Sequence, residues 1–229
     1  MKHPFHAVAI DGPSGAGKSS LARRAAAQLH FLYVDTGAIY RSIAWYALQK
    51  KVPLEQADAI AALLPEIHVE ISYGADGLQH MLIDGEDITA EIRQPAVSAA
   101  ASKVAAVPEV RAYLLEMQRR LALENNVIMD GRDIGTVVLP DAQVKVFLVA
   151  SVEERARRRH KENLEKGIPS DFEELKVAIE KRDYYDSHRE NSPLVQAVDA
   201  VSIDTTGMSI DEVVQAIINL VNDENSAKK

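Results

Sequence analysis

Eight residues near the start of the chain have the types and spacing of a phosphate-binding loop: Gly12-Pro13-Ser14-Gly15-Ala16-Gly17-Lys18-Ser19. Glycines allow the backbone to approach a ligand closely, so successive N–H groups can point at the phosphates of ATP where a helix begins. Lys18 is expected to neutralise the β and γ phosphates, and Ser19 to offer its hydroxyl to Mg²⁺, although Ser20 could take that place. The loop therefore predicts ATP as a donor, with Mg²⁺, but it does not define a reaction.

Two further segments carry residues that suit a second phosphate group. They are Asp35-Thr36-Gly37-Ala38-Ile39-Tyr40-Arg41 and Asp130-Gly131-Arg132-Asp133-Ile134-Gly135-Thr136, and each follows an apolar run. An arginine fork can hold a phosphate by two parallel charge-assisted bonds, and the Thr36 hydroxyl could complete the receptor. Arg41 could instead pair with a surface carboxylate. Because Arg132 is expected at the same edge, the pattern favours an acceptor that itself carries a phosphate.

The elements that must position these residues are short buried strands alternating with helices. Five apolar runs predict parallel strands at residues 6–10, 31–34, 127–129, 144–149 and 200–203. Segments with helical spacing, such as residues 19–30 and 209–221, make the fold class α/β with a five-stranded parallel sheet flanked by helices. Ligands bind such sheets beyond the carboxyl ends of their strands. Four of the runs are followed directly by an aspartate at this edge: Asp11, Asp35, Asp130 and Asp204.

One region departs from this alternation. Apolar and polar residues alternate from 67 to 73, turn residues follow at 74–77, and a second extended run covers 78–83 before another turn at 84–85. The pattern predicts a small antiparallel β insert, which could be a surface hairpin or a flap over a substrate. Residues 95–107 are rich in alanine and serine and are expected to form a helix.

Composition excludes several classes of protein. The 229 residues are 47% hydrophobic and include no cysteine, which excludes disulfides, thiolate metal sites and a catalytic cysteine. The formal net charge of -8 argues against broad binding to nucleic acid. Because residues 1–6 have no signal-peptide pattern and no apolar run is long enough to span a membrane, we expect a cytoplasmic protein with no membrane contact.

Two other classes of phosphate-loop protein fit the sequence poorly. A GTPase needs an N/T-K-x-D segment, in which no lysine of this chain lies, and the D-x-x-G match at Asp204 follows the last predicted strand. An ATPase module could use residues 127–130 as its metal-side strand, but it usually takes an arginine from a partner. Here the arginines are already present in the same chain.

Longer motifs give the sequence a family resemblance over essentially its whole length. They are GPSGAGKSS, DTGAIYR, DGEDITAEIR at the end of the β insert, SKVAAVPEVR, DGRDIGTVVLPDA, EERARRR and KRDYYDSHRENSPL. With these motifs the sequence resembles the bacterial cytidylate kinases, which have the nucleoside monophosphate kinase fold. The resemblance implies a monomeric enzyme that transfers the γ-phosphoryl group of ATP to CMP or dCMP. A kinase for another small-molecule acceptor is the alternative.

The resemblance also divides the chain into three regions and assigns roles to residues. It implies a core at about 1–35, 112–154 and 190–229, an acceptor-binding region with the β insert at about 36–111, and a helical lid at about 155–189. Thr36, Gly37, Arg41 and Arg132 would hold the acceptor phosphate. Ser102, Arg111 and Asp133 would read cytosine, Asp186 would bind the sugar, and Arg182 and Arg189 would contact phosphates from the lid side.

The lid implied by the resemblance includes the basic segment 153–160, which leads to a plausible hinge at Gly167-Ile168-Pro169. Arg157 or Arg158 is expected to approach the transferring phosphoryl group, with Arg157 on the ATP side. A solvated run of charges would produce the same pattern. The catalytic set expected from the resemblance is Lys18, Arg132, Arg158 and Arg182.

Overall fold

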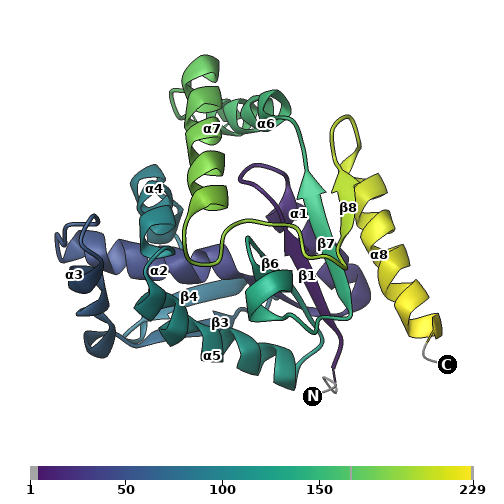
Figure 1. The fold of residues 1–229 in the computed structure, drawn as a ribbon, viewed down its shortest axis with the longest axis horizontal. Helices are drawn as coiled ribbons and strands as arrows, with labels where there is room; N and C mark the ends of the chain where they lie inside the picture. The colour runs from purple at the N-terminus through teal and green to yellow at the C-terminus, as the bar shows by residue number, and fades with distance from the viewer. Residues whose placement is uncertain (1–4, 166, 228–229) are drawn as a thin grey trace.

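The computed structural model describes residues 5–165 and 167–227, and in this part a parallel sheet lies between two layers of helices (Figure 1). The five strands of this sheet have the order β2-β6-β1-β7-β8, and all adjacent pairs are parallel. Their bounds are β1 Ala7–Asp11, β2 Leu32–Asp35, β6 Val127–Gly131, β7 Val144–Val149 and β8 Val201–Asp204. The predicted α/β class and five-stranded parallel sheet are confirmed.

The two layers follow from the alternation of side chains along each strand. Ala7 and Ala9 of β1 belong to one buried core, whereas Val8 and Ile10 belong to the other. The first core contains residues of α2 (Thr36–Gln49), α4 (Pro95–Val104) and α5 (Pro108–Glu124). The second contains residues of α1 (Lys18–Leu29) and α8 (Ile210–Ala227). Because β1 and β6 are buried on both faces, they appear in the sequence as nearly continuous apolar runs.

The β insert is a three-stranded antiparallel sheet in the order β3-β4-β5. Its strands are β3 Val69–Tyr73, β4 Gln79–Ile83 and β5 Glu86–Asp87. Val69, Met81 and Ile83 are buried in the same core as α2. The predicted insert is therefore present, but it is an integral part of the fold and the interpretation as a surface hairpin is wrong.

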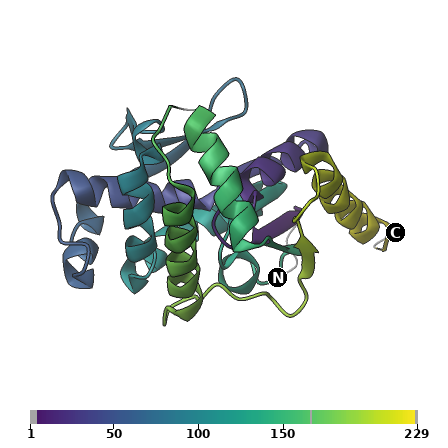
Figure 2. The same ribbon diagram turned by 90° about the horizontal axis from the view of Figure 1, so that it is seen from above.

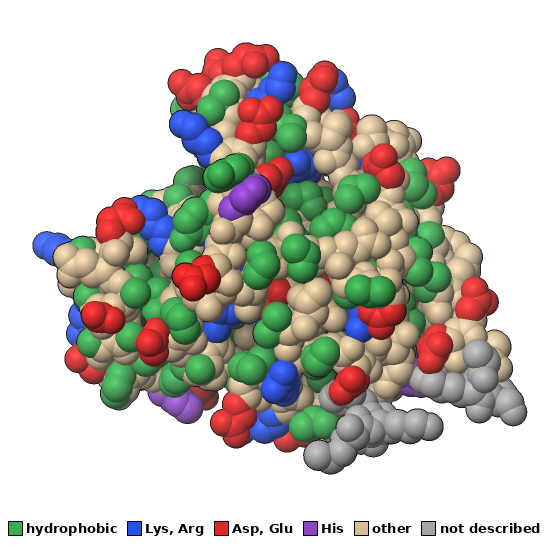
Figure 3. All heavy atoms as spheres, in the orientation of Figure 1, with side chains coloured by type: hydrophobic (Ala, Val, Ile, Leu, Met, Phe, Trp, Pro, Cys, Tyr) green, Lys and Arg blue, Asp and Glu red, His purple; other side chains and the backbone are tan. Residues whose placement is uncertain are grey.

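Two helices stand above the carboxyl ends of the strands (Figure 1). They are α6 (Val152–Glu165) and α7 (Phe172–His188), which pack against each other. In the space-filling view this pair rises from the body of the molecule and carries acidic and basic side chains close together at its upper end (Figure 3). None of the described helices has the length and apolar character needed to cross a membrane.

Short elements complete the described chain. They are α3 Ala57–Ala61, η1 Leu64–Glu66, η2 Glu91–Arg93 and the π-helical segment η3 Ile134–Val138. The last helix, α8, continues six residues beyond the end expected at residue 221, into a polar segment without apolar periodicity.

Candidate active site

One pocket of about 420 Å³ lies at the carboxyl edge of the sheet. Residues from the phosphate-binding loop, α2, α4, β6, α6 and α7 line it. Seen from above, α4, α7 and α6 lie side by side across this edge (Figure 2). The volume is typical of a site for a small molecule.

The loop between β1 and α1 has the backbone that its glycines predict. Gly12 has a φ of 148°, and a Cβ atom added there would lie 2.3 Å from the carbonyl oxygen of Leu148. Gly17, with a φ of 86°, precedes the first turn of α1. A side chain at position 12 would collide with the backbone of β7, so this close contact requires glycine.

Lys18 and Ser19 are the last two residues of the loop motif, and both lie near Asp130 of β6. Lys18 Nζ donates to the carbonyl oxygen of Pro13 at 2.7 Å, and burial together with the nearby Arg132 lowers the pKa of Lys18. Ser19 Oγ donates to Asp130 Oδ2 at 2.9 Å. Burial and the neighbouring Asp35 raise the pKa of Asp130, although Lys18 opposes this shift. Hydroxyl and carboxylate oxygens are the ligands that Mg²⁺ prefers, so Ser19 and Asp130 fit a magnesium ion.

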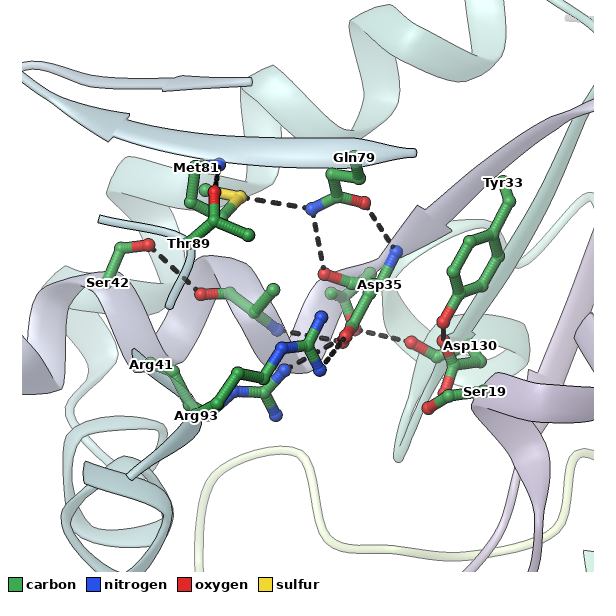
Figure 4. Close-up of polar contacts among 12 residues, drawn as sticks. Ser19, Tyr33, Asp35, Arg41, Ser42, Gln79, Met81, Thr89, Arg93 and Asp130 are labelled. Atoms are coloured by element: carbon green, nitrogen blue, oxygen red, sulfur yellow. Dashed lines mark hydrogen bonds and ion pairs between the residues drawn. The ribbon is translucent and has the colours of Figure 1, made fainter. Parts of the chain in front are cut away.

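Asp35, at the end of β2, pairs with two arginines of the pocket (Figure 4). Its Oδ1 accepts from the backbone N–H of Ala38 at 2.8 Å and so caps α2, whereas its Oδ2 accepts from Arg41 Nη2 at 2.9 Å and Arg93 Nη1 at 3.2 Å. Burial alone would raise the pKa of Asp35, but Arg41 and Arg93 outweigh it and hold that pKa below its ordinary value. Asp35 is therefore a buried carboxylate that holds two cations in place.

Thr36 and Arg132 lie next to this cluster. Thr36 Oγ1 donates to the carbonyl oxygen of Asp130 at 2.7 Å, and Arg132 Nε donates to Asp186 Oδ2 at 2.9 Å. At Gly37 an added Cβ would lie 3.0 Å from Arg41 Nη1, so the missing side chain leaves room for that guanidinium.

A second polar cluster surrounds Asp133, the residue after Arg132. Arg111 donates a hydrogen bond to Asp133 Oδ2, and its guanidinium carbon is 5.5 Å from the ring centroid of Tyr40. Arg189 Nη2 is 3.8 Å from Asp133 Oδ1. Asp11 fixes the backbone that follows Asp133, because its carboxylate accepts from the N–H groups of residues 134 and 135. The cluster presents one carboxylate between two guanidinium groups.

Helix α7 contributes a face to the same pocket. Arg182 and Asp186 are four residues apart and lie on one side of the helix, and Arg189 follows its last turn. Asp186 is only 2% exposed, and its Oδ1 accepts from Ser102 Oγ of α4 at 3.5 Å. Burial and the neighbouring Arg132 lower the pKa of Arg182 to about 10, so this side chain stays protonated at neutral pH.

The four arginines of α6 have different environments. Arg155 is buried and donates to the carbonyl oxygen of Ser14 at 3.0 Å and to Asp183 Oδ2 at 2.5 Å. Arg157 has a side chain that is 61% exposed and pairs with glutamates of its own helix. Arg158 and Arg159 line the pocket. Only part of the basic segment is therefore directed at the site.

Charge in the pocket is strongly positive although the whole chain is acidic. Among the described residues, nine basic side chains line it against five acidic ones. The basic residues are Lys18, Arg41, Arg93, Arg111, Arg132, Arg158, Arg159, Arg182 and Arg189. Arg41 Nε, Arg182 Nε and Arg189 Nη2 are buried and have no hydrogen-bond partner in the described part of the chain. Buried donors without a partner are costly, so these atoms fit anionic groups of a ligand.

Most of the residues singled out in the sequence line this pocket. They are Ser14, Gly15, Gly17, Lys18, Ser19, Ser20, Thr36, Gly37, Arg41, Ser102, Arg111, Arg132, Asp133, Arg158, Arg182, Asp186 and Arg189. Gly12, Pro13 and Ala16 shape the loop without lining the pocket, and Arg157 points away from it. Of the four aspartates expected at the edge, Asp35 and Asp130 line the pocket, Asp11 is buried beneath it, and Asp204 is exposed at the end of β8.

Several lining residues had no assigned role in the sequence interpretation. They are Asp35, Tyr40, Arg93, Ser98, Ala101, Ala105, Asp130, Gly131, Arg159 and Glu162. Tyr40 and Arg93 lie inside quoted motifs, so their chemistry was visible, but only the folded chain shows which way they point. None of the residues of β3, β4 and β5 lines the pocket, so this structure does not support the interpretation of the insert as a flap.

Comparison with known proteins decides between the families that use such a loop. The family model described as cytidylate kinase matches residues 8–223. The chain belongs to the cytidylate kinase family. A cytidylate kinase from Enterococcus faecalis (strain ATCC 700802 / V583) is 52% identical over 214 residues, which cover 93% of this chain and 94% of that protein. One from Geobacillus sp. (strain WCH70) is 51% identical over 216 residues, covering 94% and 96%.

A solved structure shares the fold at low sequence identity. It is an uncharacterized protein from Eubacterium ventriosum ATCC 27560, with a TM-score of 0.53 and 14% identity over 95% of this chain and 98% of that chain. The similarity shows the fold alone, and the cytidylate kinase assignment rests on the sequence comparisons.

Proposed function

We propose that this protein transfers the γ-phosphoryl group of ATP to CMP or dCMP and so forms ADP with CDP or dCDP. The observation that carries this proposal is that one pocket contains a phosphate-binding loop and, in its other half, a cluster of arginines. Membership of the cytidylate kinase family supports the choice of acceptor.

The acceptor phosphate is assigned to Thr36, Arg41, Arg132 and, in addition, Arg93. The support is that Arg41 and Arg93 converge on Asp35, and that the buried Nε of Arg41 has no hydrogen-bond partner among the described residues. Two guanidinium groups can hold one phosphate by parallel charge-assisted bonds.

The cytosine base is assigned to Ser102, Arg111 and Asp133. Cytosine offers an exocyclic amine to a carboxylate, and its ring nitrogen and carbonyl oxygen can accept from arginine and serine. Asp133 and Arg111 form a hydrogen-bonded pair. A base that hydrogen-bonds to both side chains would therefore replace the hydrogen bond between them by hydrogen bonds to the base. Uracil has a carbonyl in place of the amine, and an unpaired buried polar group costs about 1 to 3 kcal/mol, or roughly tenfold or more in selectivity.

The remaining acceptor contacts are assigned to the sugar and to the lid side. Asp186 would accept from a sugar hydroxyl, because it is a buried carboxylate next to Ser102 and Arg132. Arg182 and Arg189 would contact phosphate groups from the lid side. This is supported by Arg182 Nε and Arg189 Nη2, which are buried and have no hydrogen-bond partner among the described residues.

The donor half is assigned to the loop Gly12-Pro13-Ser14-Gly15-Ala16-Gly17-Lys18-Ser19, with Ser20 beside it. Ser19 with Asp130 would hold Mg²⁺, and its hydrogen bond to that carboxylate favours Ser19 over Ser20. When bound, the ion would supply positive charge to the phosphate oxygens of ATP. Arg158 is preferred to Arg157 as the lid arginine near the transferred group because Arg158 lines the pocket.

The proposed mechanism needs no nucleophile or general base from the protein. The acceptor phosphate is already anionic and would attack the γ phosphorus in line, while Lys18, Arg132, Arg158 and Arg182 compensate the charge on the oxygens. Residues of about 155–189 would close over ATP and exclude water, so ATP hydrolysis without an acceptor should be slow. The cytoplasmic location and the monomeric state stay predictions.

The test is ADP formation by the purified protein with Mg²⁺ and ATP, offering CMP, dCMP, UMP, AMP, GMP or no acceptor in parallel. The proposal expects strong turnover with CMP and dCMP, weaker turnover with UMP and almost none without acceptor. Equal turnover in every tube would indicate an ATPase, and no turnover with any of the five nucleotides would favour a kinase for another small-molecule acceptor.

A further inference from the structure

Asp35 lies on an edge strand, and a side chain from the insert completes its hydrogen bonding. The free side of β2 does not pair with another strand of the parallel sheet. There, Gln79 Oε1 accepts from the N–H of Asp35 at 2.8 Å, and Gln79 Nε2 donates to the carbonyl oxygen of Asp35 at 3.3 Å (Figure 4). The amide group of Gln79 therefore substitutes for one residue of a further strand at this point.

Gln79 is well placed to fix the position of the Asp35 backbone. It is the first residue of β4, it is 9% exposed, and its Nε2 is also 3.0 Å from Met81 Sδ. A second contact joins the insert to the same strand, because Tyr73 Oη donates to the carbonyl oxygen of Tyr33 at 3.1 Å. The insert is thus hydrogen-bonded to β2 directly beside the pocket.

The side chain of Asp35 depends on this backbone position. One carboxylate oxygen caps α2 and the other holds Arg41 and Arg93, so a shift of Asp35 moves both guanidinium groups. Figure 4 shows Gln79 on one side of Asp35 and the two arginines on the other. A hydrogen-bonded chain therefore leads from β4 through Asp35 to the arginines assigned to the acceptor phosphate.

We propose that Gln79 is a positioning residue for the acceptor phosphate, acting through Asp35 on Arg41 and Arg93. The inference rests on the proposed function, since it concerns the grip on the phosphate of CMP. It gives the insert a role as a fixed support for the acceptor site.

The test replaces Gln79 by methionine, which has a similar length but cannot form the two backbone hydrogen bonds. We expect Gln79→Met to raise the KM for CMP by about tenfold or more, with the KM for ATP changed less than about twofold. Cytidine lacks the phosphate, so its inhibition constant against CMP should also change by less than about twofold. A role in stability alone would not separate CMP from cytidine in this way.

Gln143 supplies a matched control at the opposite end of the sheet. Its Oε1 accepts from the N–H of Ala7 at 2.7 Å, and its Nε2 donates to the carbonyl oxygen of Phe5 at 3.3 Å. Gln143→Met removes the same kind of backbone pairing away from the pocket. It should leave the KM for CMP within about twofold of the unsubstituted protein.

Each outcome has a defined meaning. Suppose that the unsubstituted protein turns over CMP. The positioning role is then overturned if Gln79→Met leaves the KM for CMP unchanged, or if it raises the KM for CMP and the inhibition constant of cytidine by the same factor. If the unsubstituted protein does not turn over CMP, it is the proposed function that fails. If Gln79→Met does not fold, as judged by circular dichroism, Gln79→Glu is used in its place. The carboxylate keeps the shape and an acceptor for the Asp35 N–H, but it cannot donate to the Asp35 carbonyl oxygen. An unchanged KM for CMP in Gln79→Glu would then overturn the inference.

Discussion

Paired arginine and aspartate residues allow a strongly cationic pocket to exist inside an acidic protein. Arg41 and Arg93 are held by Asp35, Arg111 by Asp133, and Arg132 by Asp186. Burying a charge without a partner costs several kcal/mol, so each internal carboxylate lowers the cost of assembling the arginines. The guanidinium groups retain further N–H donors with which to bind an anionic ligand.

Arg93 provides a test of the acceptor grip. Arg93→Met should raise the KM for CMP about tenfold, because one charge-assisted contact to the acceptor phosphate is lost while the donor half is intact. Steady-state kinetics with CMP and ATP varied separately measures this. Arg119→Met is the control, since Arg119 lies outside the pocket and bonds to the carbonyl oxygens of residues 137 and 138. A normal KM for CMP in Arg93→Met would contradict the assignment.

Asp133 provides a test of base recognition. In Asp133→Asn the side chain loses its charge and gains an amide N–H, which can donate to the carbonyl that uracil has in place of the cytosine amine. We expect the ratio of kcat/KM for CMP over UMP to fall by about tenfold or more. Both kcat/KM values are measured on one protein preparation. A smaller fraction of active protein would lower both values equally and leave their ratio unchanged. An unchanged ratio would show that Asp133 does not read the base.

Spacing alone predicts that a residue lies at the pocket only where its motif closely follows a strand, whereas the family resemblance also pointed to residues of α4, α5 and α7. Thr36 and Arg132 come straight after predicted strands, so the geometry of a parallel sheet brings them to one edge. Arg93 is 58 residues from Asp35 along the chain, and its contact depends on how the insert and η2 pack on α2. No periodicity in the sequence encodes that packing.

Helix α6 shows how one basic segment divides into different roles. Arg155 ties the helix to the phosphate-binding loop, Arg157 pairs with Glu153 and Glu154 at the surface, and Arg158 reaches Thr205 after β8. Each residue of an α-helix is turned by about 100° from the one before it, so Arg155, Arg157 and Arg158 cannot all face one ligand.

The two adjacent arginines of α6 form a matched pair for a test. Arg158→Met should lower kcat about 100-fold, because Arg158 lines the pocket near Gly17 of the loop, where its charge would compensate the transferring group. Arg157→Met should leave kcat within about twofold, because that side chain is exposed and its loss removes only surface ion pairs. Single-turnover rates with saturating ATP and CMP measure the chemical step. The opposite ranking of the two variants would contradict the placement of the lid arginine.

Elements were predictable where apolar periodicity was strong, and less so where packing decided the outcome. The strands were located within one or two residues, because buried parallel strands are nearly continuous apolar runs. The sequence does not define the role of the insert, because alternating residues at 67–83 specify strands without specifying what their buried face covers. Only the burial of Met81 against the core shared with α2 answers that question.

On the scale of the whole molecule, the core contains a buried carboxylate whose ionisation affects stability. Burial raises the pKa of Asp11 to about 6 from its ordinary 3.8, although two backbone N–H groups oppose the shift. The folded state therefore binds this proton more tightly than the unfolded state does. The resulting stabilisation is fully present below about pH 4 and is lost as the pH rises through about 6.

Asp11→Asn tests this pH dependence because the amide resembles the neutral carboxyl group but does not titrate. We expect the free energy of unfolding of the unsubstituted protein, relative to Asp11→Asn, to fall by up to about 3 kcal/mol between about pH 4 and pH 7. Urea unfolding at a series of pH values measures both proteins. A constant difference between them would show that the pKa of Asp11 is not raised.

The central claim is that this fold assembles a donor site and a cytosine-reading acceptor site in one pocket. Competition in a single vessel tests it most directly: ATP and Mg²⁺ with equimolar CMP, dCMP, UMP, AMP and GMP, followed by chromatography of the nucleoside diphosphates formed. The account predicts CDP and dCDP as the first products, with little UDP and almost no GDP, and ADP equal to the sum of the other diphosphates. Equal amounts of CDP, dCDP, UDP and GDP, or ADP in clear excess over their sum, would contradict it.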